Sequence, residues 1–311
     1  MRRTLQLRLK SKRRFFFCAA CPSLLIFVIF FGKSHLKDRE VIPLTISNFE
    51  LVSDRQWSQF TSNFKAHNRA YQDFCATKLS LGSGPSKIGS QFEQDVFLAR
   101  NIFAAKLIRG EPGFYIDSGA NDAELLSNTL LFDVCFGWGG LCIEPDLRYH
   151  SGLREKRSCV VVPECISNVT QSLKFQPTGT SGKVQDGETS ISIQCRNLAG
   201  MLQKYSNGVA HVDLWSLDVE GYEMTVLESV AWSAVSFTAL LIETFWLSAR
   251  LVDRYLTERH FVKTHQLAID SLYLYWAQAS DWRPDLWEKS WIANERYRDL
   301  MREAGRLSKD Y

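Results

Sequence analysis

The sequence predicts an α/β fold built on a mostly parallel sheet. Short apolar runs typical of strands alternate with runs whose apolar residues recur at helical spacing, and this order favours parallel strands with helices on both faces. The last two apolar runs flank a tight turn, which predicts a closing hairpin and one antiparallel strand. Four runs end in an acid, and the carboxyl ends of parallel strands form one sheet edge, where ligands bind. These acids are Asp117, Glu144, Asp218 and Glu243.

The first half of the expected sheet lies between residues 114 and 146. Residues 114–116 form an apolar run ending in Asp117, and a turn with Gly119, Asn121 and Asp122 follows. Residues 127–136 are expected to form a helix, and residues 141–143 a second strand ending in Glu144. Strand, turn, helix, strand and terminal acid are typical of half a nucleotide-binding fold.

The chemistry of this turn favours a nucleoside without phosphate. Gly119 has no Cβ, so the backbone can approach a ligand closely. An acid at the position of Glu144 can accept both hydroxyl protons of a ribose. A dinucleotide turn carries three glycines, whereas Asn121 and Ala123 stand where others would be. We therefore expect S-adenosylmethionine rather than a pyrophosphate ligand.

The other elements follow from the same periodicities. Before the first strand we expect a stem with a helical apolar face, a linker at 79–90 and a helix within 91–107. The stem face consists of Trp57, Phe60, Phe64, Tyr71 and Phe74. After Glu144 the expected order is helix 147–154, strand 159–162, short strand 173–175, mobile loop 178–190, helix 198–205, strand 211–219, a helix containing 224–227, strand 237–242, helix 251–259, and strands 261–269 and 271–276.

The N-terminus predicts a membrane anchor. Seven basic residues and no acid precede residue 15, and residues 15–31 carry no charge. A span of this length is at the short end of the roughly 17–25 residues needed to cross a bilayer. We expect a single-pass signal anchor of type II, with the rest of the chain in the Golgi or ER lumen; a cleaved signal peptide is the alternative. The total charge of +3 leaves about −4 beyond the tail, so no nucleic-acid partner is expected.

The cysteines fit a lumenal domain. Cys18 and Cys21 lie in the expected span, where they are best explained as apolar or palmitoylated residues. Six others remain, an even number that permits disulfides in an oxidising compartment. Cys159 and Cys165 flank one apolar run and are the first expected pair. Asn168 opens the sequon Asn-Val-Thr and is the candidate site of an N-glycan.

Several motifs in order resemble the FkbM family of S-adenosylmethionine-dependent methyltransferases. They are S-Q-F-E-Q-D at 90–95, G-F-Y-I-D-S-G-A-N-D at 113–122, S-N-T at 127–129, G-W-G-G-L-C-I-E-P at 137–145, Arg157 with Cys159, and L-D-V-E-G-Y-E at 217–223. The resemblance implies a Rossmann-like class I methyltransferase sheet over residues 90–276. The remaining segments would be a basic tail (1–14), the anchor (15–31), a stem (32–89) and an aromatic extension (277–311). Members with an N-terminal anchor resemble the Star-like group.

The resemblance also implies roles for individual residues. Asp117, Gly119, Asn121 and Asp122 would line the methionine end of the cofactor, and Glu144 would take the ribose diol. Asp218 and Glu220 would face the reacting centre, where a carboxylate could remove the proton of an acceptor hydroxyl. The lumenal address suggests a glycan hydroxyl as acceptor. The family commonly has glycine at position 123, so Ala123 is a departure that could crowd the turn.

Two other functions compete with an O-methyltransferase. One is a non-catalytic, Star-like membrane protein that binds or escorts secretory cargo. The other is a nicotinamide-dependent oxidoreductase, which the missing glycines of the turn disfavour. No metal is expected, because His211, His260 and His265 are scattered and no His, Cys or Asp group has the spacing of metal ligands.

Overall fold

The computed structural model describes residues 52–80, 88–187, 189–245 and 249–275. All of them belong to one compact unit, Leu44–Tyr311. The expected basic tail, membrane anchor and C-terminal extension lie outside the described residues. Among the residues that are described, no helix is long and apolar enough to span a bilayer.

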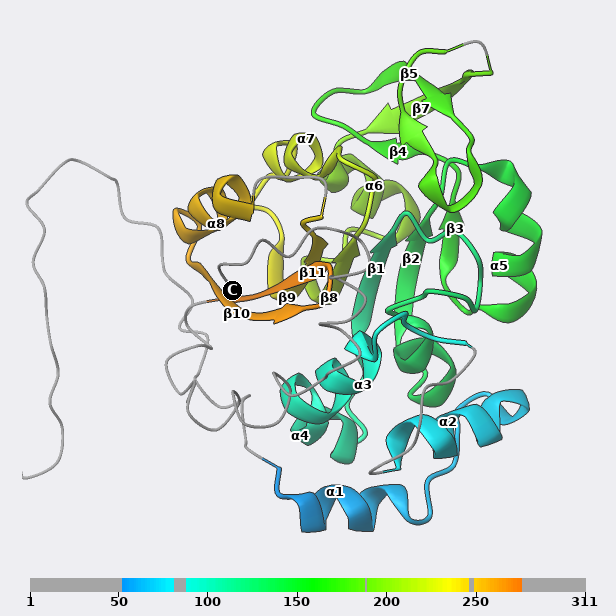
Figure 1. Cartoon of the computed structure of the whole chain (residues 1–311), viewed down its shortest axis with the longest axis vertical. Coiled ribbons are helices and arrows are strands. Elements are labelled where there is room, and N and C mark those ends of the chain that lie inside the picture. The colour runs from blue at the N-terminus through cyan, green and yellow to red at the C-terminus, as the bar shows by residue number, and fades with distance from the viewer. Residues whose placement is uncertain (1–51, 81–87, 188, 246–248, 276–311) are drawn as a thin grey trace, which may run out of the picture. The chain divides into compact units, whose positions relative to one another are not determined.

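A seven-stranded, mostly parallel sheet forms the centre of the domain and confirms the predicted fold class (Figure 1). The strand order is β10-β11-β9-β8-β1-β2-β3, and β11 is the one antiparallel member of this sheet. The strands are β1 (Phe114–Ser118), β2 (Gly139–Ile143), β3 (Val160–Val162), β8 (His211–Leu217), β9 (Ser236–Glu243), β10 (Phe261–Leu267) and β11 (Asp270–Tyr275). Glu144 and Asp218 directly follow β2 and β8, Glu243 ends β9, and Asp117 is the last but one residue of β1.

Helices cover both faces of this sheet because successive strand residues point to opposite sides. Tyr115 belongs to one hydrophobic cluster and its neighbour Ile116 to the other. The first face packs against α1 (Asp54–Thr61), α2 (Gln72–Leu79), α3 (Gln94–Phe97), α4 (Ala104–Ile108) and α5 (His150–Lys156). The second face packs against α6 (Leu198–Tyr205), α7 (Glu223–Glu228) and α8 (Ala249–Thr257).

The described part of the stem packs on the domain, as its apolar face predicts. Trp57 is buried and donates from Nε1 to the carbonyl of Leu79 at 3.1 Å. Ser53 and Gln56 form a reciprocal cap that starts α1. A disulfide joins Cys75 on α2 to Cys135, the last residue of the helical segment Leu131–Cys135 that precedes β2. Residues 54–79 are therefore part of the folded unit.

The helix expected at 127–136 is much shorter in the structure. Only Leu131–Cys135 forms a helical segment, and it has the wide π geometry. The hydroxyl of Ser127 accepts hydrogen bonds from the backbone N–H groups of Thr129 and Leu130. Ser127 therefore acts as a side-chain cap, and the chain becomes helical only after it.

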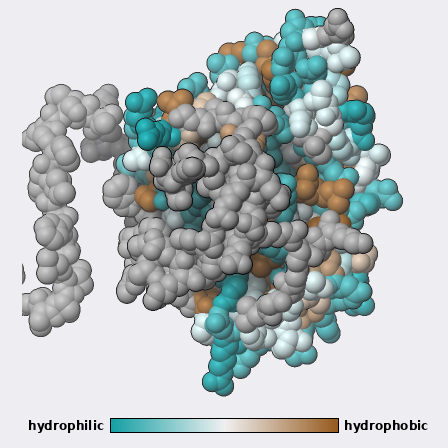
Figure 2. All heavy atoms as spheres, viewed as in Figure 1, coloured by the Kyte–Doolittle hydropathy of each residue, from teal (hydrophilic) through white to brown (hydrophobic). Residues whose placement is uncertain are grey.

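A second, four-stranded sheet is built around the loop expected at 178–190, in which only Lys183–Val184 forms a strand. Its order is β4-β7-β5-β6, with β4 (Cys165–Ile166), β5 (Gln171–Gln176), β6 (Lys183–Val184) and β7 (Ile191–Arg196). Phe175, Ile193 and the Cys165–Cys195 pair form its small core. This sheet lies beyond the carboxyl ends of β1 and β2 (Figure 1). Hydrophilic side chains predominate over it in the space-filling view (Figure 2).

The expected Cys159–Cys165 disulfide is wrong. Cys159 pairs with Cys142, and Cys165 pairs with Cys195. The reason is that the two cysteines enter different sheets: Cys159 precedes β3 beside β2, whereas Cys165 opens β4 directly opposite Cys195 of β7.

Candidate functional site

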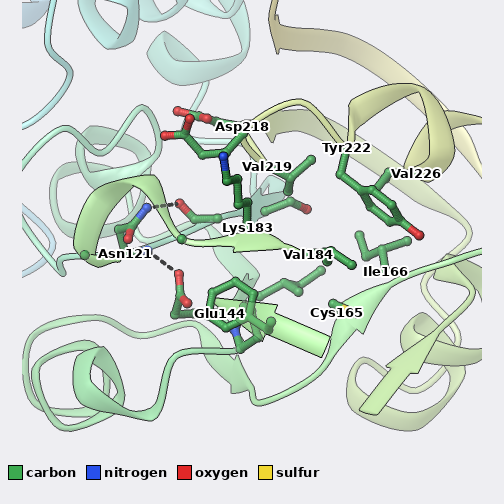
Figure 3. A pocket seen from close by; sticks show the side chains of 18 residues that line it. Asn121, Glu144, Cys165, Ile166, Lys183, Val184, Asp218, Val219, Tyr222 and Val226 are labelled. Carbon is green, nitrogen blue, oxygen red and sulfur yellow. Dashed lines mark hydrogen bonds between the residues drawn. The ribbon is translucent and has the colours of Figure 1, made fainter. Parts of the chain in front are cut away.

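A pocket lies where the carboxyl ends of β1, β2 and β8 face the small sheet (Figure 3). About 560 Å³ of space inside it is not filled by protein atoms, and part of that space is open to solvent. The main sheet and the segment after β8 contribute Ser118, Gly119, Asn121, Ile143, Glu144, Pro145, Asp218, Val219, Glu220, Tyr222 and Val226. The small sheet contributes Cys165, Ile166, Phe175, Gly179, Gly182, Lys183 and Val184.

The first turn of the site requires glycine at position 119 for two reasons. Its φ of +79° lies in the left-handed region that side chains disfavour. A Cβ there would lie 1.9 Å from the carbonyl oxygen of Asp218, the residue after the neighbouring strand β8. The backbone N–H of Gly119 also donates to the carbonyl of Ile143 at 3.0 Å. The turn is thus pressed between the ends of β2 and β8.

Glu144 meets this turn directly. Its Oε2 accepts the backbone N–H of Asn121 at 2.9 Å, and its Oε1 accepts that of Asp146 at 2.7 Å (Figure 3). Each carboxylate oxygen has two lone pairs, so one acceptor position on each is left for a ligand hydroxyl. Burial raises the pKa of Glu144 to about 7, although both N–H groups favour its charged form.

Asp117 and Asp122 do not line the pocket. Asp117 is buried, and its Oδ2 accepts from the hydroxyls of Thr129 at 2.6 Å and Ser127 at 3.3 Å. Asp122 uses Oδ1 to accept the N–H groups of Glu124 and Leu125. Of the five residues expected to bind cofactor, the structure brings Gly119, Asn121 and Glu144 together and leaves these two in supporting positions.

A buried ionic network holds Asp117 and the S-N-T segment against the first face of the sheet. Arg157 donates to Asp133 at 2.8 Å, to the hydroxyl of Thr129 at 2.7 Å and to that of Ser127 at 3.1 Å. Tyr115 completes the network through its hydroxyl, which donates to Asp133 at 2.6 Å. These motif residues therefore stabilise the turn at Gly119 from the first face of the sheet and not from the pocket.

Ala123 does not crowd the pocket. It is buried, belongs to the hydrophobic cluster of the first face and is absent from the pocket wall. Its methyl group faces Gly152 of α5, where a Cβ would lie 3.9 Å away. The departure from glycine is therefore accommodated by a small residue on α5.

Asp218 and Glu220 both line the pocket. They stand beside other acids: Glu223 at the start of α7, Glu243 at the end of β9, and Asp270 at the start of β11. Burial, followed by the charge of Glu243, raises the pKa of Asp218 well above its usual range. Burial and then Glu220 raise the pKa of Glu243 to about 8.

Of the small sheet, the sequence predicted only the short strand at 173–175, and the pocket wall that the sheet forms was not predicted. Lys183 extends from β6 into the pocket, and Val184 lies beside it (Figure 3). The signal was present in residues 191–195, I-S-I-Q-C, where apolar and polar residues alternate as in a half-buried strand. A strand at that place needs a partner, which residues 171–176 supply.

Residues 117–263 match the family model described as the Methyltransferase FkbM domain. The chain carries an FkbM methyltransferase domain. No curated protein matches the chain. The match begins at the end of β1 and ends in β10, so it includes the small sheet and every pocket residue, whereas β11 lies beyond it. The family indicates an S-adenosylmethionine-dependent methyltransferase.

Proposed function

We propose that the FkbM domain binds S-adenosylmethionine in this pocket and methylates a hydroxyl group. The contact between the Asn121 backbone and Glu144 supports this most directly, because it joins the glycine turn to the acid after β2. A bound nucleoside needs two features together. One is a turn such as that at Gly119, where the absence of a side chain lets the backbone approach the ligand closely, and the other is an acceptor such as Glu144 for the two ribose hydroxyls. Both line one cavity.

The residues present fit this cofactor. Glu144 would hold the ribose hydroxyls with its remaining acceptor positions, and Gly119 and Asn121 would face the methionine part. Ile143, Ile166 and Val226 supply apolar surface to the same cavity. When bound, S-adenosylmethionine supplies an electrophilic methyl group.

Asp218 and Glu220 would act on the acceptor. Both reach the pocket from the segment after β8. A carboxylate near the acceptor can take the hydroxyl proton and orient the oxygen, which contributes about 10²–10⁴-fold to rate. Positioning of the acceptor supplies most of the remainder.

We propose that this domain works in the Golgi or ER lumen, anchored by residues 15–31, and that its acceptor is a glycan. Three disulfides among the six cysteines beyond that segment support an oxidising compartment. Asn168 is exposed in the bend between β4 and β5, a suitable place for an N-glycan.

Calorimetry and a tritium-transfer assay test the proposal. The full chain should bind S-adenosylmethionine and S-adenosylhomocysteine and should transfer labelled methyl groups to a glycan library. Binding without transfer to any hydroxylated acceptor would favour the Star-like, cargo-binding alternative. If the chain shows no binding and no transfer, the cofactor assignment itself is refuted.

A further inference from the structure

Three carboxylates from different elements meet beside the pocket. Asp218 directly follows β8, Glu223 opens α7 and Glu243 ends β9. One oxygen from each of them lies within 4.8 Å of the others. We propose that Asp218, Glu223 and Glu243 bind a divalent metal cation, and that this cation holds the acceptor hydroxyl. The second part rests on the proposed function, and the first does not.

Two of these acids have an unused buried oxygen. Glu223 and Glu243 are 0% and 5% exposed. Within the described part of the chain, Oε2 of Glu223 and Oε2 of Glu243 have no hydrogen-bond partner. Buried polar atoms are nearly always satisfied in folded proteins, so an unpartnered oxygen on each of two members of this group points to a ligand. A cation would supply the missing partner to both.

The backbone fixes the direction of Glu223. Its Oε1 accepts the N–H groups of Val219 and Gly221, each at 3.0 Å. These two bonds clamp one oxygen of the carboxylate to the turn after β8 and leave Oε2 available on the other side. Metal sites require ligands held in place by such second contacts.

The negative charges of these three carboxylates also favour a bound cation. Among the described residues, no lysine or arginine forms an ion pair with Asp218, Glu223 or Glu243. Asp218 and Glu243 do share a side-chain hydrogen bond, so a proton can join that pair. A proton leaves Oε2 of Glu223 unsatisfied, whereas a cation bound by all three neutralises the whole group.

The ligand type indicates a hard cation. Carboxylate oxygens select Mg²⁺, Mn²⁺ or Ca²⁺, which take six or more ligands and leave positions open beyond three carboxylates. Asp218 lines the pocket, so open positions would face the cavity. A hydroxyl bound there would be polarised and would lose its proton more readily. Asp218 then serves as a ligand, and Glu220 is the remaining proton acceptor.

Manganese binding to the metal-stripped full chain, in detergent micelles, tests the site. The electron paramagnetic resonance signal of free Mn²⁺ should disappear on binding to wild type. E243Q and E223Q should each weaken binding by more than roughly tenfold. E223Q keeps an oxygen for the clamp with Val219 and Gly221, so thermal melting should show it folded. E228Q, which changes an exposed acid on the same helix, should bind as wild type does.

The outcomes separate this proposal from the methyltransferase assignment. Loss of Mn²⁺ binding in E223Q and E243Q but not in E228Q supports the site, even in a chain that binds no S-adenosylmethionine. Failure of Mn²⁺, Mg²⁺ and Ca²⁺ to bind wild type better than E223Q overturns it. Full methyl transfer in excess chelator would overturn the role of the cation while leaving the methyltransferase intact.

Discussion

The backbone N–H of Asn121 donates to Oε2 of Glu144 at 2.9 Å, which joins the turn after β1 to the acid after β2. The two residues are 23 positions apart, and parallel pairing of β1 with β2 brings them together. This contact gives the pocket its most specific feature, a carboxylate held by two backbone N–H groups with acceptor capacity left for a ligand.

Replacing Glu144 with glutamine should weaken cofactor binding. A hydrogen bond to a charged group contributes about 1.5–3 kcal/mol, so we expect affinity for S-adenosylmethionine to fall roughly 10- to 100-fold in calorimetry. E155Q, an exposed acid on α5, is the matched control and should bind normally. Equal affinities for E144Q and wild type would remove the ribose role of this acid.

Adding a methyl group at position 119 should destabilise the domain strongly. The new Cβ would lie 1.9 Å from the carbonyl oxygen of Asp218, and the alanine would have to keep the φ of +79° that side chains disfavour. We expect Gly119→Ala to lower the free energy of unfolding by about 2–5 kcal/mol in urea titrations. Gly110→Ala has a similar φ of +66° with nothing within 4 Å, so it should cost only about 1–2 kcal/mol. Equal losses would show that strain at φ alone explains position 119.

Removing the Arg157 guanidinium should destabilise the domain, because the guanidinium holds the buried network that supports the turn at Gly119. Its side chain is fully buried, and its loss leaves Asp133 without its ionic partner. We expect Arg157→Met to lower the free energy of unfolding by about 3–5 kcal/mol. Arg154→Met, an exposed change on the same helix, should stay within about 0.5 kcal/mol of wild type. A loss under 1 kcal/mol in Arg157→Met would show that the network adds little.

Stability should fall as pH rises from 5 to 8. Burial raises the pKa of Glu144 from 4.5 and of Asp270 from 3.8, both to about 7. The folded chain therefore holds these protons at pH values where the unfolded chain has lost them, so each contribution is largest in acid and is lost through pH 7. Between its unfolded and folded pKa, one such group lowers the free energy of unfolding by about 1.4 kcal/mol for each pH unit. Urea titrations should give E144Q a slope shallower by about that amount, and parallel slopes would contradict it.

Breaking the disulfide of the small sheet should affect binding as well as stability. Cys165 lines the pocket, and its bond to Cys195 closes a separation of 30 residues. Removing such a bond costs about 3 kcal/mol. We expect C165S/C195S to lose both stability and cofactor affinity in urea titration and calorimetry. C142S/C159S removes a disulfide away from the pocket wall and should lose stability alone. Unchanged affinity in C165S/C195S would show that the small sheet is not part of the binding site.

The sequence predicted the main sheet well because its signals are local. Strand acids, the lone glycine of the turn and the closing hairpin each depend on neighbouring residues, and all appear where expected. The Gly119, Asn121 and Glu144 constellation also followed from order along the chain. The strand at 191–196 and its pairing with the expected strand at 173–175 were missed, because the alternating pattern at 191–195 is short and its partner lies about 20 residues earlier.

The amino-acid sequence by itself determined the fold class, the edge that carries the acids and the FkbM resemblance. Only the tertiary structure decided which cysteines pair, why Ala123 is harmless, and that Asp117 supports the turn rather than lining the pocket. It also brought Glu223 and Glu243 together from separate elements. The physical reason is that spacing along the chain fixes local conformation, whereas contacts between distant side chains depend on how strands pair and faces pack.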